Sequence, residues 1–163
     1  MYRFIKSRLR IMMFLQFFIW GAWYATAGNY MKSAGMTDII YLAYMASPIG
    51  SVVAPFFLGM IADRFMAVQK VMGVMHLVAG VAIFCAPFTA VGPHASPGLF
   101  LALLLVNMLC YMPTLGLATA TAFHLLPDKE KQFPLIRVFG TFGWIVAGIL
   151  VSYVFRGDAT GIP

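Results

Sequence analysis

Hydrophobic residues dominate five long stretches of the chain, and most polar residues gather between them. A run of roughly 20 apolar residues is long enough to cross the hydrocarbon core of a bilayer as a helix. The pattern therefore predicts an all-α membrane protein with five transmembrane helices. The predicted spans are approximately 11–31, 40–62, 69–90, 99–124 and 135–155. They divide the chain into a basic tail at 1–10, a transmembrane region at 11–155 and a short tail at 156–163.

The first stretch has one alternative interpretation. A basic segment precedes it, and Ala25-Thr26-Ala27 resembles the cleavage site of a signal peptide. The run is longer than the 7 to 15 residues of a typical signal-peptide core and is rich in Trp and Phe, which favours a retained helix.

The composition and the charge pattern support this membrane assignment. Of the 163 residues, 62% are hydrophobic and only 10% are charged, unlike a soluble globular protein. The net charge is +6, but the basic residues are sorted between loops, so we expect a lipid bilayer and no nucleic acid as the partner. The positive-inside rule then predicts a cytoplasmic N-terminus and an outer C-terminus. The inner side would hold Arg3, Lys6, Arg8, Arg10, Arg64, Lys70, Lys129, Lys131 and Arg137, and the outer side Lys32 and Arg156.

The fifth span carries an arginine near its start, and a charge within an apolar run calls for a physical explanation. Arg137, Thr141 and Trp144 are spaced i, i+4 and i+7, so they share one face of a helix. The opposite flank carries small residues that allow close helix packing: Gly140, Gly143, Ala147 and Gly148. This spacing predicts a binding face for a polar, planar molecule. Alternatively, Arg137 is an anchor that extends to the membrane surface.

Two further spans repeat this spacing with other polar and aromatic residues. The sets are Gln16, Trp20 and Trp23 in the first span, and Asn107, Tyr111 and Thr114 in the fourth. Polar side chains at this depth usually face a bundle interior or an aqueous cavity. The alternative is that they bond one helix to another.

Titratable residues argue against an enzyme and against a metal site. The five acids lie in loops or at helix ends, and the three histidines have no paired-ligand spacing, so we expect no metal and no cofactor. His76 is the one histidine within a helix-lined interior, either as a hydrogen-bonded core residue or as a proton carrier. Asp63 and Arg64 end the second span as a candidate gating pair, or as ordinary charges at a helix end.

Six segments of the sequence carry a family resemblance: Phe14-Leu-Gln16-Phe, Trp20-Gly21-Ala22-Trp23, Gly59-x-x-x-Asp63-Arg64, Tyr111-Met-Pro-Thr-Leu-Gly-Leu117, Phe133-Pro134 through Arg137, and Gly140-Thr141. Together they resemble the N-terminal part of the bacterial nucleoside:proton symporter family within the major facilitator superfamily. The resemblance implies two six-helix halves that hold a nucleoside between them and work by alternating access. It assigns the binding arginine, threonine and aromatic residue to Arg137, Thr141 and Trp144, where the family tends to have phenylalanine at the last position.

The same resemblance implies a transporter of the bacterial inner membrane whose proton-coupling acids belong to the other half. The chain would then be a truncated or partial transporter, with the missing C-terminal half as its partner and the proton as its coupling ion. Weaker binding candidates are Gln16, Trp20, Trp23, Asn107 and Tyr111. The alternatives are a transporter of another solute, such as a sugar, and a five-span accessory or scaffold protein.

Overall fold

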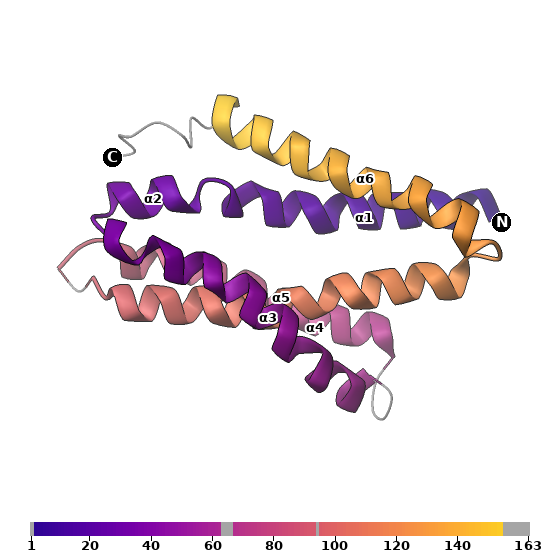
Figure 1. Ribbon diagram of the computed structural model, residues 1–163, viewed down its shortest axis with the longest axis horizontal. Coiled ribbons are helices and arrows are strands. Elements are labelled where there is room, and N and C mark those ends of the chain that lie inside the picture. The colour runs from indigo at the N-terminus through magenta and orange to yellow at the C-terminus, as the bar shows by residue number, and fades with distance from the viewer. Residues whose placement is uncertain (1, 63–66, 94, 155–163) are drawn as a thin grey trace. The chain divides into compact units, whose positions relative to one another are not determined.

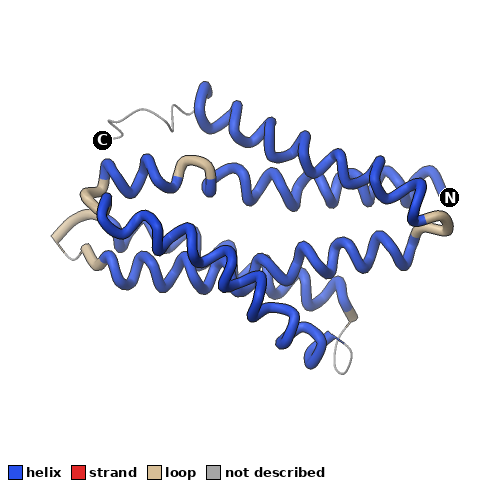
Figure 2. The backbone as a smooth tube through the Cα atoms, viewed as in Figure 1, coloured by secondary structure: helices blue, strands red, loops and turns tan. Residues whose placement is uncertain are grey.

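The computed structural model describes residues 2–62, 67–93 and 95–154, and its regular elements within these ranges are helices (Figure 2). Lipid offers no hydrogen bonds to a backbone, so an apolar chain satisfies its own N–H and C=O groups by forming helices. The α-helices are α1 (Tyr2–Tyr24), α2 (Ala27–Ser33), α3 (Ile40–Ala62), α4 (Val68–Ala90), α5 (Pro97–Leu125) and α6 (Lys129–Ile149). A 3₁₀ turn at Thr37–Ile39 precedes α3, and a π-helical turn at Leu150–Val154 follows α6.

Five described stretches are long and apolar enough to cross a membrane, which confirms the five predicted spans. They are Phe4–Ser33, Thr37–Ala54, Val68–Ala90, Pro97–Leu125 and Lys129–Val154. Gly35, in the loop between α2 and α3, has a φ of 77°, a left-handed backbone conformation that glycine adopts without steric cost. The predicted tail at 156–163 lies outside the described residues.

The first and last spans begin earlier than predicted. α1 begins at Tyr2, so the basic segment is helical, because Arg and Lys are good helix formers. Its location in the cytoplasm remains a prediction. α6 begins at Lys129 because the Asp128 carboxylate accepts a hydrogen bond from the Lys131 backbone N–H at 3.2 Å and caps the helix. The helix continues through Pro134, which removes one backbone donor.

The first span is divided near its C-terminal end. The Thr26 hydroxyl donates to the Trp23 carbonyl at 3.3 Å, and the Thr26 backbone N–H donates to the same oxygen at 3.2 Å. These bonds close a turn between α1 and α2 (Figure 1). The aromatic segment of α1 therefore ends at Tyr24.

The chain forms two compact units. Unit 1 consists of Met1–Ser33 and Ala118–Pro163, and unit 2 consists of Ala34–Leu117. Within unit 1, α1 and α6 lie side by side although they are the first and last α-helices in the sequence (Figure 1). Arg10 near the start of α1 contacts Phe139, whereas Gly21 near its end lies against Trp144 and Ala147, later in α6, so the two helices run in the same direction.

Unit 2 is built on small residues that let its helices approach closely. A Cβ atom at Gly50 of α3 would lie 2.7 Å from the Met108 carbonyl oxygen of α5. On α4 the buried residues include a stripe of alanines at positions 79, 82, 86 and 90. Such stripes are typical of helix pairs in membranes, where packing replaces the hydrophobic effect.

Candidate functional site

The helix α6 has a packing face and a polar face, as its sequence predicts. Gly140, Gly143 and Ala147 are buried on the packing face. A Cβ atom at Gly143 would overlap the Phe14 carbonyl oxygen of α1. The prediction of close approach is confirmed for these three residues. At Gly148 a Cβ atom would meet no atom of another described segment within 4 Å, so close packing there stays a prediction.

The polar face of α6 carries the predicted stripe. Arg137 and Thr141 are exposed, and Trp144 is half-buried. Among the residues that the structure describes, no carboxylate pairs with Arg137, and neither Arg137 nor Thr141 makes a side-chain hydrogen bond. The guanidinium donors and the hydroxyl are therefore available to a polar ligand.

An aromatic cluster from both helices adjoins this stripe in unit 1. We define the aromatic cluster as Trp20, Tyr24 and Trp144. The Trp144 ring lies 5.0 Å from the Trp20 ring at 84° and 6.2 Å from the Tyr24 ring, and Trp20 lies 5.5 Å from Tyr24. These edge-to-face contacts are the preferred geometry of aromatic pairs and fix the Trp144 ring against α1.

Arg137 also contacts α1 directly. Its guanidinium carbon lies 4.1 Å from the centre of the Phe17 ring, which is close enough for a cation–π interaction. The stripe on α6 thus has aromatic neighbours on α1 at both ends, Phe17 beside Arg137 and the aromatic cluster beside Trp144.

The weaker candidates of α1 differ in their surroundings. Trp20 belongs to the aromatic cluster, and Gln16 is buried, with only 4% of its surface exposed. Trp23 is half-buried and contacts the Tyr24 ring at 5.5 Å. The structure therefore places Trp20 with the α6 stripe, while binding roles for Gln16 and Trp23 remain predictions.

The polar set of α5 lies in unit 2 and is described by itself. The Asn107 amide donates to the Ala79 carbonyl of α4 at 2.8 Å, and the Thr114 hydroxyl donates to the Tyr111 carbonyl at 2.6 Å. The His76 ring lies 5.6 Å from the Tyr111 ring. The Asn107 bond joins two helices, as expected of the alternative interpretation. The Asn107 Oδ1 atom is buried and accepts no hydrogen bond from the described residues, so Asn107 stays a candidate. A binding role for Tyr111 likewise remains a prediction.

Some predicted features fall elsewhere. Asp63 and Arg64 lie outside the described residues, so their gating role stays a prediction. Within the described ranges, no group of three or more His, Cys, Asp or Glu side chains is arranged to hold a metal ion.

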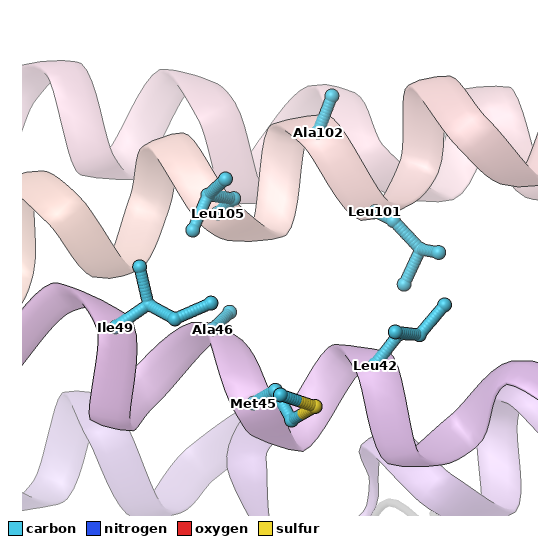
Figure 3. A pocket seen from close by; sticks show the side chains of 7 residues that line it. All are labelled: Leu42, Met45, Ala46, Ile49, Leu101, Ala102 and Leu105. Carbon is cyan, nitrogen blue, oxygen red and sulfur yellow. The ribbon is translucent and has the colours of Figure 1, made fainter.

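A hollow of about 250 Å³ between α3 and α5 of unit 2 is unsuited to a polar ligand. Figure 3 shows its lining, which consists of aliphatic side chains and one thioether: Leu42, Met45, Ala46, Ile49, Leu101, Ala102 and Leu105. It offers no side-chain hydrogen-bond donor, so it is not the candidate site.

Two neighbours of the stripe, Phe17 and Tyr24, were not predicted as site residues. Their sequence signal is their place in the aromatic segment around Trp20, at i−3 and i+4. That spacing puts both near the face that carries Trp20, although it does not show which helix they meet.

The comparisons with known proteins agree with the fold. Residues 4–160 match the model of the nucleoside H⁺ symporter family. The chain is 36% identical to the xanthosine permease of Escherichia coli K12 and 33% identical to the nucleoside permease NupG of the same strain. Each match covers 91% of this chain and 36% of the relative.

Solved structures of NupG also match. A crystal structure of the nucleoside transporter NupG matches with a TM-score of 0.78 at 31% identity, and that of an aspartate-to-alanine mutant with a TM-score of 0.80 at 30% identity. Both matches cover 95% of this chain, and they cover 38% and 39% of the NupG chains. The chain therefore spans little more than a third of the length of these relatives.

The matched residues include all five membrane-crossing stretches, and the matched structures share their helical arrangement. The protein is a multi-pass membrane protein, and it belongs to the nucleoside H⁺ symporter family, in the major facilitator superfamily.

Proposed function

We propose that the chain supplies the N-terminal part of a proton-coupled nucleoside transporter of the bacterial inner membrane. Arg137, Thr141 and Trp144 then form one wall of its nucleoside site. The observation that carries this proposal is the α6 stripe. Its guanidinium and hydroxyl have no hydrogen-bond partner among the described residues, and they lie beside an aromatic ring that α1 holds in place.

The chemistry of the stripe suits a nucleoside. A nucleoside combines a flat base with a ribose that carries hydroxyl groups, and both bear hydrogen-bond acceptors. The Arg137 guanidinium and the Thr141 hydroxyl can bond those polar atoms, while the exposed part of the Trp144 ring can stack on the base. A hydrophobic solute would leave the guanidinium without a partner, which costs binding free energy.

The rest of the transporter completes the proposal. The chain spans 36% of NupG, so we assign the opposite wall of the site to a C-terminal half. The described acids Asp38, Asp128 and Glu130 all lie near helix starts, so we also assign proton coupling to that half. The proposed activity moves a solute without changing its bonds, and it requires no catalytic residue.

Replacing Arg137 by alanine tests the proposal. The protein expressed from its whole reading frame is purified, and binding of uridine and of adenosine is measured by isothermal titration calorimetry. We expect Arg137→Ala to weaken binding roughly 10- to 100-fold, since a hydrogen bond to a charged group contributes about 1.5–3 kcal/mol. Membrane insertion and thermal stability should stay close to those of the parent.

The matched control is Arg8→Ala, which removes another arginine that lies over a ring, 4.8 Å from the centre of Phe4. It should leave binding unchanged. If Arg137→Ala inserts less well yet binds normally once purified, Arg137 is a membrane anchor. If the parent binds neither nucleoside, the site serves another solute or the protein is an accessory subunit.

A further inference from the structure

The Phe17 ring occupies the space between Arg137 and the backbone of α6 at Gly140. A Cβ atom at Gly140 would lie 2.6 Å from Cδ2 of Phe17, 3.1 Å from Cε2 and 3.2 Å from Cγ. The ring therefore occupies the space that a side chain at position 140 of α6 would need. The centre of the same ring lies 4.1 Å from the Arg137 guanidinium carbon. Arg137 precedes Gly140 by less than one turn of α6.

An aromatic ring packed against a guanidinium changes how an arginine binds a ligand. An arginine side chain has several rotatable bonds and loses conformational entropy when a ligand fixes it. A ring beneath the guanidinium restricts that side chain before the ligand arrives, and restriction before binding increases affinity. The ring contact uses none of the guanidinium N–H groups as hydrogen-bond donors to the described residues, so they stay available to the ligand.

We propose that Phe17 and Gly140 are positioning residues that hold the Arg137 guanidinium in its binding orientation and thereby raise the affinity for a nucleoside. This inference rests on the proposed function. Gly140 acts because it has no side chain, and Phe17 acts through the face of its ring. Neither residue needs to touch the nucleoside.

The decisive comparison is between Phe17→Leu and Phe17→Tyr. Leucine keeps an apolar side chain and removes the ring, whereas tyrosine keeps the ring face. We expect Phe17→Leu to weaken binding of uridine and adenosine roughly 3- to 10-fold, the range that a cation–π interaction supports. Phe17→Tyr keeps the ring and should bind within about twofold of the parent. A difference between the two variants would show that the ring face, and not apolar packing alone, is required.

A matched control removes a second cation–π contact between the same helices. In that pair the Arg10 guanidinium carbon lies 5.3 Å from the centre of the Phe139 ring. Phe139→Leu should therefore bind nucleoside as the parent does. A second variant, Gly140→Ala, keeps Phe17 but displaces its ring. It should weaken nucleoside binding as Phe17→Leu does. It therefore tests the inference even if Phe17→Leu does not fold.

Several outcomes would overturn the inference. Parent-like binding by Phe17→Leu, or by Gly140→Ala, would show that the contact between the Phe17 ring and Arg137 has no effect on affinity. Equal losses in Phe17→Leu and Phe17→Tyr would show that the ring face is not responsible. The Arg137→Ala variant separates the two proposals: if it loses binding while Phe17→Leu does not, only the positioning role fails, and if it binds normally, the proposed site itself fails.

Discussion

Trp144 has two edge-to-face contacts in the aromatic cluster and yet stays half-buried. Trp20 and Tyr24 fix the ring from the α1 side, so its orientation is set before any ligand binds. The exposed part of a ring that is already fixed offers a stacking surface at little entropic cost. In the proposed site this contribution differs from that of Arg137, whose guanidinium would supply directed hydrogen bonds to the nucleoside.

The role of the ring predicts different effects for two substitutions. Trp144→Phe keeps an aromatic face and should bind nucleosides within about threefold of the parent, whereas Trp144→Ala should bind roughly 10-fold more weakly, because stacking contributes about 1–3 kcal/mol per base. Calorimetric titration with uridine and adenosine measures both variants. Parent-like binding by Trp144→Ala would show that the ring serves only to pack α6 against α1.

At the scale of single residues, the α6 stripe could be predicted and its support could not. Helical spacing is enough to place Arg137, Thr141 and Trp144 on one face. The identity of their α1 neighbours depends on how the two helices are aligned along their axes, which no spacing within one helix determines. The place of Phe17 beside the stripe therefore follows only from the structure, in which its ring lies against Gly140.

At the scale of helices, the contact between α1 and α6 depends on the absence of a side chain at Gly143. A Cβ atom there would meet the carbonyl oxygen of Phe14, and a backbone atom cannot move aside as a flexible side chain does. The two helices would have to separate locally, with the loss of packing along both.

This geometry predicts a large effect at one glycine and none at another. Gly143→Ala should lower the free energy of unfolding by about 1–3 kcal/mol, the usual cost of overpacking a close contact. Gly148→Ala, in the same helix, adds a Cβ atom that would meet nothing within 4 Å in the described part of the chain, so it should be neutral or slightly stabilising. Thermal unfolding of the detergent-purified variants compares them. Equal melting temperatures would mean that α1 and α6 are not held at this distance.

The five spans could be predicted because hydrocarbon imposes a minimum apolar length, whereas their ends follow local bonds. Asp128 extends α6 by accepting the Lys131 N–H, and Thr26 interrupts the first span by bonding Trp23. Such short-range bonds compete with hydropathy at every helix end. The prediction of the spans was therefore correct while their boundaries moved by several residues.

At the scale of the whole molecule, the sorting of basic residues predicts the orientation in the membrane. Alkaline phosphatase is active only outside the cytoplasm, so it should be active when fused after Gly92 or after Val154 and inactive when fused after Leu126. The reason is that nine of the 11 basic residues lie on the side assigned to the cytoplasm. The reverse activity pattern would invert the topology and place Arg137 near the outer surface.

The pairing of α1 with α6 also has a consequence for biosynthesis. The ribosome makes α1 first, but its partner in unit 1 is the last α-helix that the structure describes. Translation proceeds at about 5–20 residues per second, so Phe17 waits roughly 6 to 24 s in the translocon or bilayer before Arg137 is synthesised. During that interval the aromatic face of α1 is open to lipid or to insertion factors. Ribosome stalling between these positions should therefore expose α1 to crosslinking far more than release of the finished chain does.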